Sequence, residues 1–240
     1  MEVSGTKSVV SASHPTLGEA LRSMLLQFRI PSTLRVKSLG VGLAAGIARN
    51  TQVMKSRLKQ FSKRIPRFKM LRRAGVDAAR LVRTGGLAAL MHGFGGSGVS
   101  PSVLLHQRRA VQSAAAPKNG LGGQELEMAM MIADGSKTGR ADPAFPAHVD
   151  VVQHWAQAIW NRWLPVASLQ VGLDYARTRV TESLRPWSVA TGPAAALLLT
   201  LDRVGWTVVD ATNLTTDTGR TIELSTDPPV VVARQMEAAV

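Results

Sequence analysis

Apolar and polar positions near the start of the chain predict a strand, an amphipathic helix and a second strand. Residues 7–12 and 33–41 are rich in β-prone side chains and read as strands. Between them, over residues 15–29, apolar side chains recur at spacings of three and four, which is the pattern of an amphipathic helix. Residues 1–48 are therefore expected to form a small strand–helix–strand unit.

The next segment predicts a long helix with one narrow apolar stripe. Asn50 suits the position before its first turn and Gly75 suits its end, while Pro66 is expected to kink or split it near Ile65. Five apolar side chains are spaced four, three, four and three residues apart and so share one face: Met54, Leu58, Phe61, Ile65 and Phe68. We expect this stripe to pack on the helices that follow Asp77.

Helical patterns continue after this segment as far as residue 134. Asp77 is a suitable cap for a helix over 78–91, which the pair Gly85-Gly86 weakens. The remaining elements expected are a loop at 92–99, a helix at 100–116, a loop at 117–123 and a Met-rich helix at 124–134. Residues 49–134 are therefore expected to form one basic helical region.

A loop over residues 135–146 is the best candidate for a boundary before a C-terminal helical region, 147–240. The pattern there predicts three helices, a small hairpin and a last helix that opens at Asp227-Pro228: the helices at 147–163, 166–184 and 192–204, and the hairpin between 206–209 and 220–224 through 217–219. The expected fold class is α+β, mostly helical.

Composition removes several classes of protein. The 240 residues include no cysteine, which excludes disulfide scaffolds, thiolate metal sites and cysteine nucleophiles. No apolar run approaches the ~20 residues of a membrane-spanning helix, and the first residues lack the pattern of a signal peptide. We therefore expect an intracellular protein without a transmembrane segment, for which the nucleus is one candidate location.

The net charge of +13 is concentrated in the first part of the chain. Residues 1–90 hold 17 Lys and Arg against three Asp and Glu, whereas residues 91–240 hold 12 against 13. Such an asymmetry indicates a polyanionic partner, either a nucleic acid or an anionic membrane surface.

The strongest signal for function is a run of ten basic residues between positions 49 and 73, with no acidic residue among them. A helix built only for solubility would intersperse acids, because like charges repel one another along a helix. We expect these side chains to bind the backbone of RNA or DNA without reading its sequence: Arg49, Lys55, Arg57, Lys59, Lys63, Arg64, Arg67, Lys69, Arg72 and Arg73.

Two other interpretations of this segment stay open at this point. A solvated charged face over a core-packing stripe would need no partner at all. Alternatively, the stripe from Met54 to Phe68 could insert into an anionic membrane surface, with the basic residues facing the lipid headgroups.

The sequence contains no recognisable motif for a catalytic, metal or cofactor site. Residues 93–98 are rich in glycine, but no strand precedes them and no Gly-Lys-Ser/Thr follows, so an ordinary helix connection is the expectation. The five histidines lack zinc-site spacing, and Glu125 and Glu127 would point to different faces of a helix. We expect no catalytic residue, no metal, no cofactor and no small-molecule ligand, and we expect the five tryptophans, all in the C-terminal half, mainly to pack in the core.

Several short motifs resemble the C-terminal side of the reverse transcriptases of non-LTR retrotransposons. Lys7–Ser11, the following helix and Leu34–Val41 resemble the end of the palm, and the basic helices resemble the thumb. The segment Leu90–Pro101 resembles the stretch just beyond the thumb, although His92 stands where an aromatic residue is usual. The later tryptophans resemble the tail of these polyproteins: Trp155, Trp163, Trp187 and the turn at Gly205-Trp206.

The resemblance implies an RNA-directed DNA polymerase, but this chain departs from the pattern that polymerisation requires. Such enzymes hold two metal ions with paired aspartates before the lysine-bearing strand, and the nine aspartates here are never adjacent. The expectation is therefore a fragment or decayed copy that is not an enzyme on its own and that retains sequence-independent nucleic-acid binding.

Overall fold

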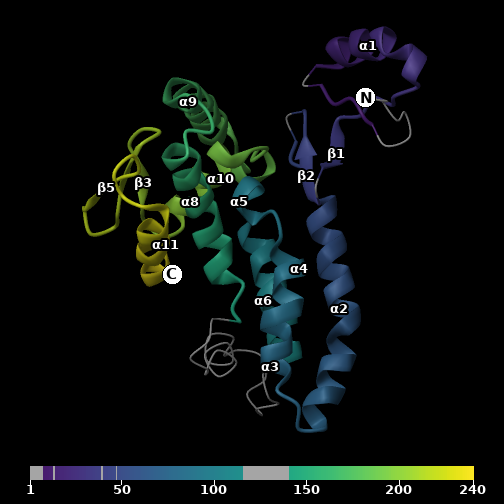
Figure 1. Cartoon of the computed structure of the whole chain (residues 1–240), viewed down its shortest axis with the longest axis vertical. Coiled ribbons are helices and arrows are strands. Elements are labelled where there is room, and N and C mark those ends of the chain that lie inside the picture. Colours follow the sequence, from purple (N-terminus) through teal and green to yellow (C-terminus); the bar gives the residue numbers. More distant parts are fainter. Residues whose placement is uncertain (1–7, 13, 39, 47, 116–140) are drawn as a thin grey trace.

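The computed structural model describes residues 8–12, 14–38, 40–46, 48–115 and 141–240. Figure 1 shows a small N-terminal unit at one end of the long helix α2, helices that run back along α2, and a C-terminal part beside them. The expected fold class, α+β and mostly helical, is confirmed. The expected helix at 124–134, the loop at 117–123 and Lys7 lie outside the described residues.

The N-terminal unit differs from the expected strand–helix–strand arrangement in how its strands pair. Helix α1 (Pro15–Met24) and a 3-10 turn, η1 (Leu26–Phe28), form as expected. The described part of the first expected strand makes only a single parallel bridge, between Val10 and Ser32. The second expected strand turns back at Gly40, whose φ of +82° suits glycine, and forms an antiparallel hairpin of β1 (Arg35–Ser38) and β2 (Val41–Ala44).

Helix α2 (Gln52–Arg73) is unbroken for 22 residues, so Pro66 does not split it, which was one of the two outcomes expected there. A proline removes one backbone hydrogen bond, to the carbonyl of Ser62 four residues earlier. Both residues are exposed, so water can satisfy that carbonyl. At the other end, the side-chain oxygen of Asn50 accepts from Gln52 N at 3.2 Å, and its amide nitrogen donates to a carbonyl of each hairpin strand, which joins the hairpin to α2.

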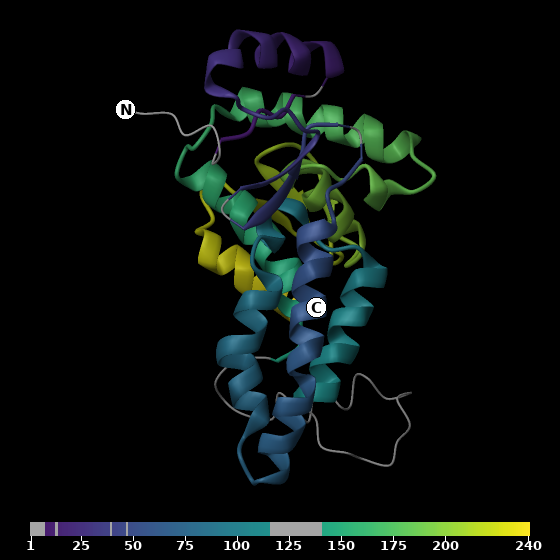
Figure 2. The ribbon, with the colours of Figure 1, turned by 90° about the vertical axis from the view of Figure 1, so that its right-hand side faces the viewer.

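The chain returns along α2 through α3 (Ala78–Leu81), a π-helical turn η2 (Val82–Leu87) and α4 (Ala88–Met91). The expected cap is present, because Asp77 Oδ1 accepts from Arg80 N at 2.9 Å. The expected loop at 92–99 contains a single helical turn, α5 (Phe94–Ser97), between two glycines with positive φ. Helix α6 (Pro101–Ala115) follows and completes the group of helices that Figure 2 shows alongside α2.

The apolar stripe of α2 packs on these helices, as expected. Phe61 lies in a cluster with Val82, Leu90 and Val111, and the remaining members of the stripe pack against this cluster or, in the case of Met54, against its neighbour. One glycine of the Gly85-Gly86 pair has a packing role: a Cβ atom on Gly86 would lie 2.8 Å from the Phe61 ring, whereas one on Gly85 would meet no atom within 4 Å. A side chain on Gly86 would therefore push the two helices apart.

The C-terminal part is built from four longer helices around a small sheet. These elements are α8 (Ala144–Trp160), α9 (Val166–Glu182), a 3-10 turn η3 (Pro186–Ser188), α10 (Pro193–Asp202), β3 (Thr207–Val208), β4 (Asn213–Thr215), β5 (Thr221–Glu223) and α11 (Pro229–Ala239). Trp155, Leu197, Leu214, Ile222 and Met236 share one buried core.

The expected hairpin between residues 206–209 and 220–224 is wrong, because β4 lies between β3 and β5 and pairs with both. The turn before β4 is set by Asp210, whose Oδ1 accepts from the backbone N–H groups of Thr212 at 2.7 Å and Asn213 at 2.9 Å. An aspartate that bonds to the backbone two and three residues later is a typical turn former.

Contacts cross the expected boundary between the basic helices and the C-terminal part. Phe94 and Leu104 share a buried cluster with Ala147 of α8. Asp142, which is 6% exposed at its side chain, accepts from Arg108 Nε at 2.9 Å and from Arg108 Nη2 at 2.6 Å. A buried ion pair and a shared apolar cluster therefore hold α6 and α8 together.

Candidate nucleic-acid interface

The outer side of α2 carries a group of exposed cations, which we call the basic face. Helical geometry places it opposite the apolar stripe, so the packing of that stripe on α4 and α6 turns these side chains to solvent. Six of the ten basic residues expected to bind nucleic acid are exposed here: Lys55, Lys59, Lys63, Arg64, Arg67 and Arg73.

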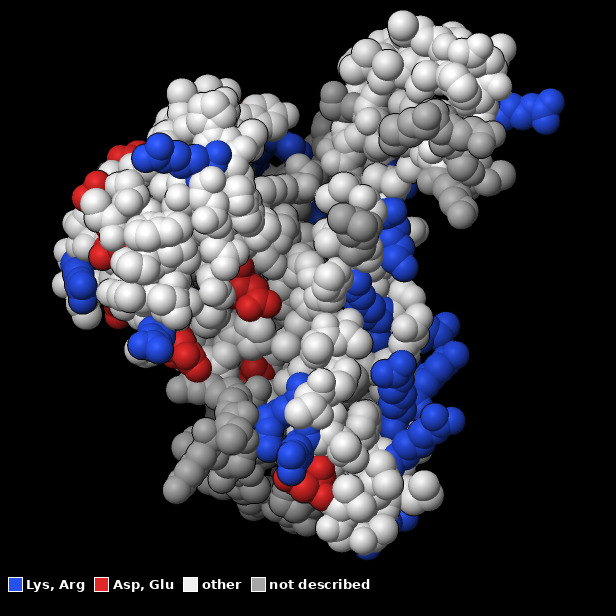
Figure 3. Space-filling view, viewed as in Figure 1, with Lys and Arg blue, Asp and Glu red and all other residues white. Residues whose placement is uncertain are grey.

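The basic face forms a continuous row of positive charge. Lys55, Lys59, Lys63 and Arg67 recur every fourth residue, so neighbouring members are separated by about 6 Å along the helix axis. Figure 3 shows Lys and Arg along the edge of the molecule formed by α2, while Asp and Glu gather mostly over the other parts of this view. Within the described residues, none of the six side chains of the basic face forms a hydrogen bond or an ion pair.

Arg49 does not lie on the basic face, although the sequence placed it in the same group. It is only 8% exposed, and its Nη2 donates to the carbonyl of Ser97 at 2.6 Å and to that of Gly98. Its guanidinium lies 5.2 Å from the ring centre of Trp187. Burial, and to a lesser degree the charge of Arg203, lowers the pKa of Arg49 to about 10. Arg49 therefore joins α2 to the C-terminal part instead of facing a ligand.

Arg57 is partly buried, and its guanidinium is occupied by contacts with the chain itself. Its guanidinium donates to the carbonyls of Gly40 and His92, which ties α2 to the hairpin turn and to the end of α4. Burial lowers the pKa of this side chain. Lys69 and Arg72 are partly buried. The structure thus divides the ten residues into six on the basic face and four that are partly or fully buried.

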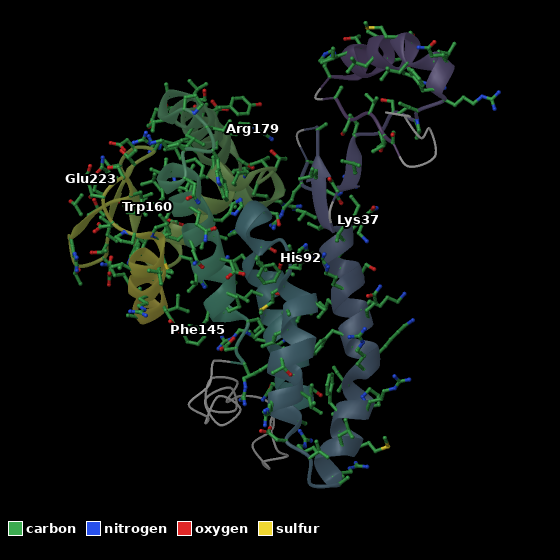
Figure 4. All side chains as sticks on the ribbon, viewed as in Figure 1. Lys37, His92, Phe145, Trp160, Arg179 and Glu223 are labelled. Atoms are coloured by element: carbon green, nitrogen blue, oxygen red, sulfur yellow. The ribbon has the colours of Figure 1, made fainter. Side chains whose placement is uncertain are left out.

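Two further exposed cations, which were not among the ten expected, lie on the hairpin that precedes α2. Arg35 and Lys37 are exposed and stand on the same side of β1, since residues two apart on a strand share a face. Figure 4 shows Lys37 beside the beginning of α2. The hairpin, whose turn at Gly40 was not predicted, thus brings Lys37 next to the start of the helix that carries the row.

The packing of the apolar stripe argues against its insertion into a membrane surface. Phe61 is 4% exposed and Met54 is 8% exposed, and the other members of the stripe are partly buried. The apolar surface that would have to enter a lipid layer is thus already covered by protein. Among the helices that the structure describes, none is both long and apolar enough to cross a membrane.

Elsewhere in the described residues, the side chains that could bind a metal or an anion do not form a recognisable site. No group of three or more His, Asp or Glu side chains is placed to hold a metal ion in those parts. The glycine-rich segment packs on α8 instead of surrounding an anion, since a Cβ atom on Gly95 would lie 2.9 Å from the carbonyl oxygen of Asp150.

The tryptophans are not all core residues. Trp155 and Trp206 are buried, and Trp155 donates to the carbonyl of Ala211 at 2.9 Å. Trp160 and Trp163 are instead exposed by 44% and 52%, and Trp187 lies close to two arginines, Arg49 and Arg203.

Comparisons with known proteins assign no family: no family model matches the chain, and no curated protein or solved structure matches it. The charge, exposure and geometry of this surface are therefore the observations that indicate what it binds.

Proposed function

We propose that the protein binds the sugar–phosphate backbone of RNA or DNA through the basic face of α2, without sequence specificity. The observation that carries the proposal is a row of six exposed cations, with no acidic residue on the same helix. Like charges in one row repel one another, and an anionic partner would relieve that repulsion. Lysine and arginine side chains on a helix surface contact phosphates and carry no base readout by themselves.

The proposal includes the ancestry that the sequence motifs suggest. The chain would correspond to the end of the palm, the thumb and the downstream part of a retroelement reverse transcriptase, acting in the cell interior and without polymerase activity of its own. The lack of adjacent aspartates supports the last point, because in-line phosphoryl transfer by two metal ions needs carboxylates that hold both ions.

Salt dependence gives the proposal a quantitative form. If all six cations of the basic face neutralise one phosphate each, log K for duplex binding should fall against log salt with a slope of about −5. The affinity should then fall roughly 1,000-fold between 50 and 200 mM salt. A protein held by base contacts or by apolar stacking would show a much smaller slope.

The test compares two triple variants that lose the same charge. Lys59→Gln, Lys63→Gln and Arg67→Gln together remove half of the basic face, so the slope should halve to roughly −2.5. The control combines Arg185→Gln, Arg220→Gln and Arg234→Gln, three exposed arginines of the C-terminal part. Fluorescence anisotropy with a labelled duplex of arbitrary sequence measures both slopes. If the two variants behave alike, net charge alone attracts the nucleic acid and the proposed face is wrong.

A further inference from the structure

A cavity of about 280 Å³ opens between α9 and the beginning of α10, away from the basic face. Its walls are mostly apolar and include Trp155, Leu169 and Ala176. Gly172 lies on the α9 side of this cavity, and a Cβ atom there would meet no other atom within 4 Å. Gly172 is exposed, so the cavity is open to solvent at this point of its wall.

One end of the cavity is positively charged. Arg179 lines it, donates from Nη1 to Thr191 Oγ1 at 3.3 Å and lies 5.4 Å from the ring centre of Tyr175. Next to it begins α10, whose first turn carries the partial positive charge of a helix N-terminus and has no side-chain cap. Among the residues that the structure describes, no Asp or Glu lines the cavity. An apolar wall that ends in a cation and in uncapped backbone N–H groups complements an apolar molecule that ends in an anion.

We propose that this cavity binds a small apolar carboxylate of the medium-chain fatty acid class. The hydrocarbon chain lies along Leu169, Gly172 and Ala176, where burial of each CH₂ group favours binding. The carboxylate lies at Arg179 and the first turn of α10, where a charge-assisted hydrogen bond fixes the direction of the ligand. The size of the cavity restricts the ligand to a small molecule. Figure 4 shows Arg179 on the part of the molecule formed by α9, so this site is separate from the one proposed for nucleic acid.

The test titrates the full chain with decanoate by isothermal titration calorimetry, below the concentration at which decanoate forms micelles. Decanol, which has the same hydrocarbon chain and no charge, is the matched ligand. We expect one decanoate per chain and at least roughly 10-fold weaker binding of decanol, because decanol lacks the charge-assisted contact. Equal affinity for the two ligands would overturn the proposal, and so would the absence of decanoate binding.

Three variants locate the binding. Gly172→Leu fills the cavity from α9 and should abolish decanoate binding, while the melting temperature stays equal or rises because leucine favours a helix more than glycine does. Arg179→Gln should weaken decanoate at least roughly 10-fold and leave decanol unchanged. Arg185→Gln, an exposed arginine after α9 that does not line the cavity, should change neither. Unchanged decanoate binding in either of the first two variants would place the ligand elsewhere and refute the site.

Discussion

Replacement of Phe61 by alanine is the most direct test of how α2 is oriented, because the whole basic face depends on this side chain pointing inward. Phe61 is 4% exposed, packs on Val82, Leu90 and Val111, and lies 5.9 Å from the Phe68 ring between ring centres. If the face assignment is right, Phe61→Ala removes a central buried side chain and leaves a cavity between α2 and the helices that return along it.

The cost of Phe61→Ala should be about 3–5 kcal/mol of unfolding free energy, as for other buried phenylalanines. We expect the upper part of this range, because one wall of the site is the backbone at Gly86, which has no side chain that could move into the space. Since natural domains are stable by only ~5–15 kcal/mol, the change should be large. With an m value of about 3 kcal/mol/M, the urea midpoint should fall by roughly 1.3–1.7 M.

Urea denaturation followed by circular dichroism measures this change, and Lys63→Ala is the matched control. Lys63 lies on the same helix, is exposed and forms no hydrogen bond or ion pair within the described residues, so its truncation should change the unfolding free energy by no more than about 0.5 kcal/mol. The same control should weaken duplex binding. If Phe61→Ala unfolds at the parent's urea concentration while Lys63→Ala is destabilised, the two faces of α2 are reversed and the nucleic-acid proposal fails with them.

Two further predictions concern carboxylates around α8. Asp142→Ala takes the charge away from the buried guanidinium of Arg108 and removes the cap at Ala144 N, so it should cost about 3–5 kcal/mol in urea denaturation; an unchanged midpoint would show that the pair is not buried in solution. Burial raises the pKa of Asp150 to about 6, above the ~3.9 of an unfolded chain. The folded state therefore binds more protons between about pH 4 and 6, and this contribution to stability is lost as the pH rises through 6. Asp150→Asn should stabilise the protein at pH 7 by about 1–2 kcal/mol, a value reduced for solvent screening at this half-buried site, and by less at pH 4. A stability difference between variant and parent that does not change with pH would contradict this reasoning.

Local patterns predicted the elements of this protein better than they predicted how strands pair. The stripe from Met54 to Phe68 specified both the helix and its buried side, because helical periodicity is written into neighbouring residues. The turn at Gly40 and the third strand at 213–215 were missed. Each depends on a backbone conformation that one residue, Gly40 or Asp210, makes possible but does not by itself require.

The sequence by itself determined that the excess positive charge lies within residues 1–90. It also determined that the segment from 49 to 73 has ten basic residues and no acidic one. Only the tertiary structure decided which of those cations face solvent. Arg49 and Lys63 look equivalent in the sequence, yet Arg49 is buried beside Trp187, which lies 138 residues later in the chain. Burial depends on contacts between segments far apart in sequence, and no local pattern contains that information.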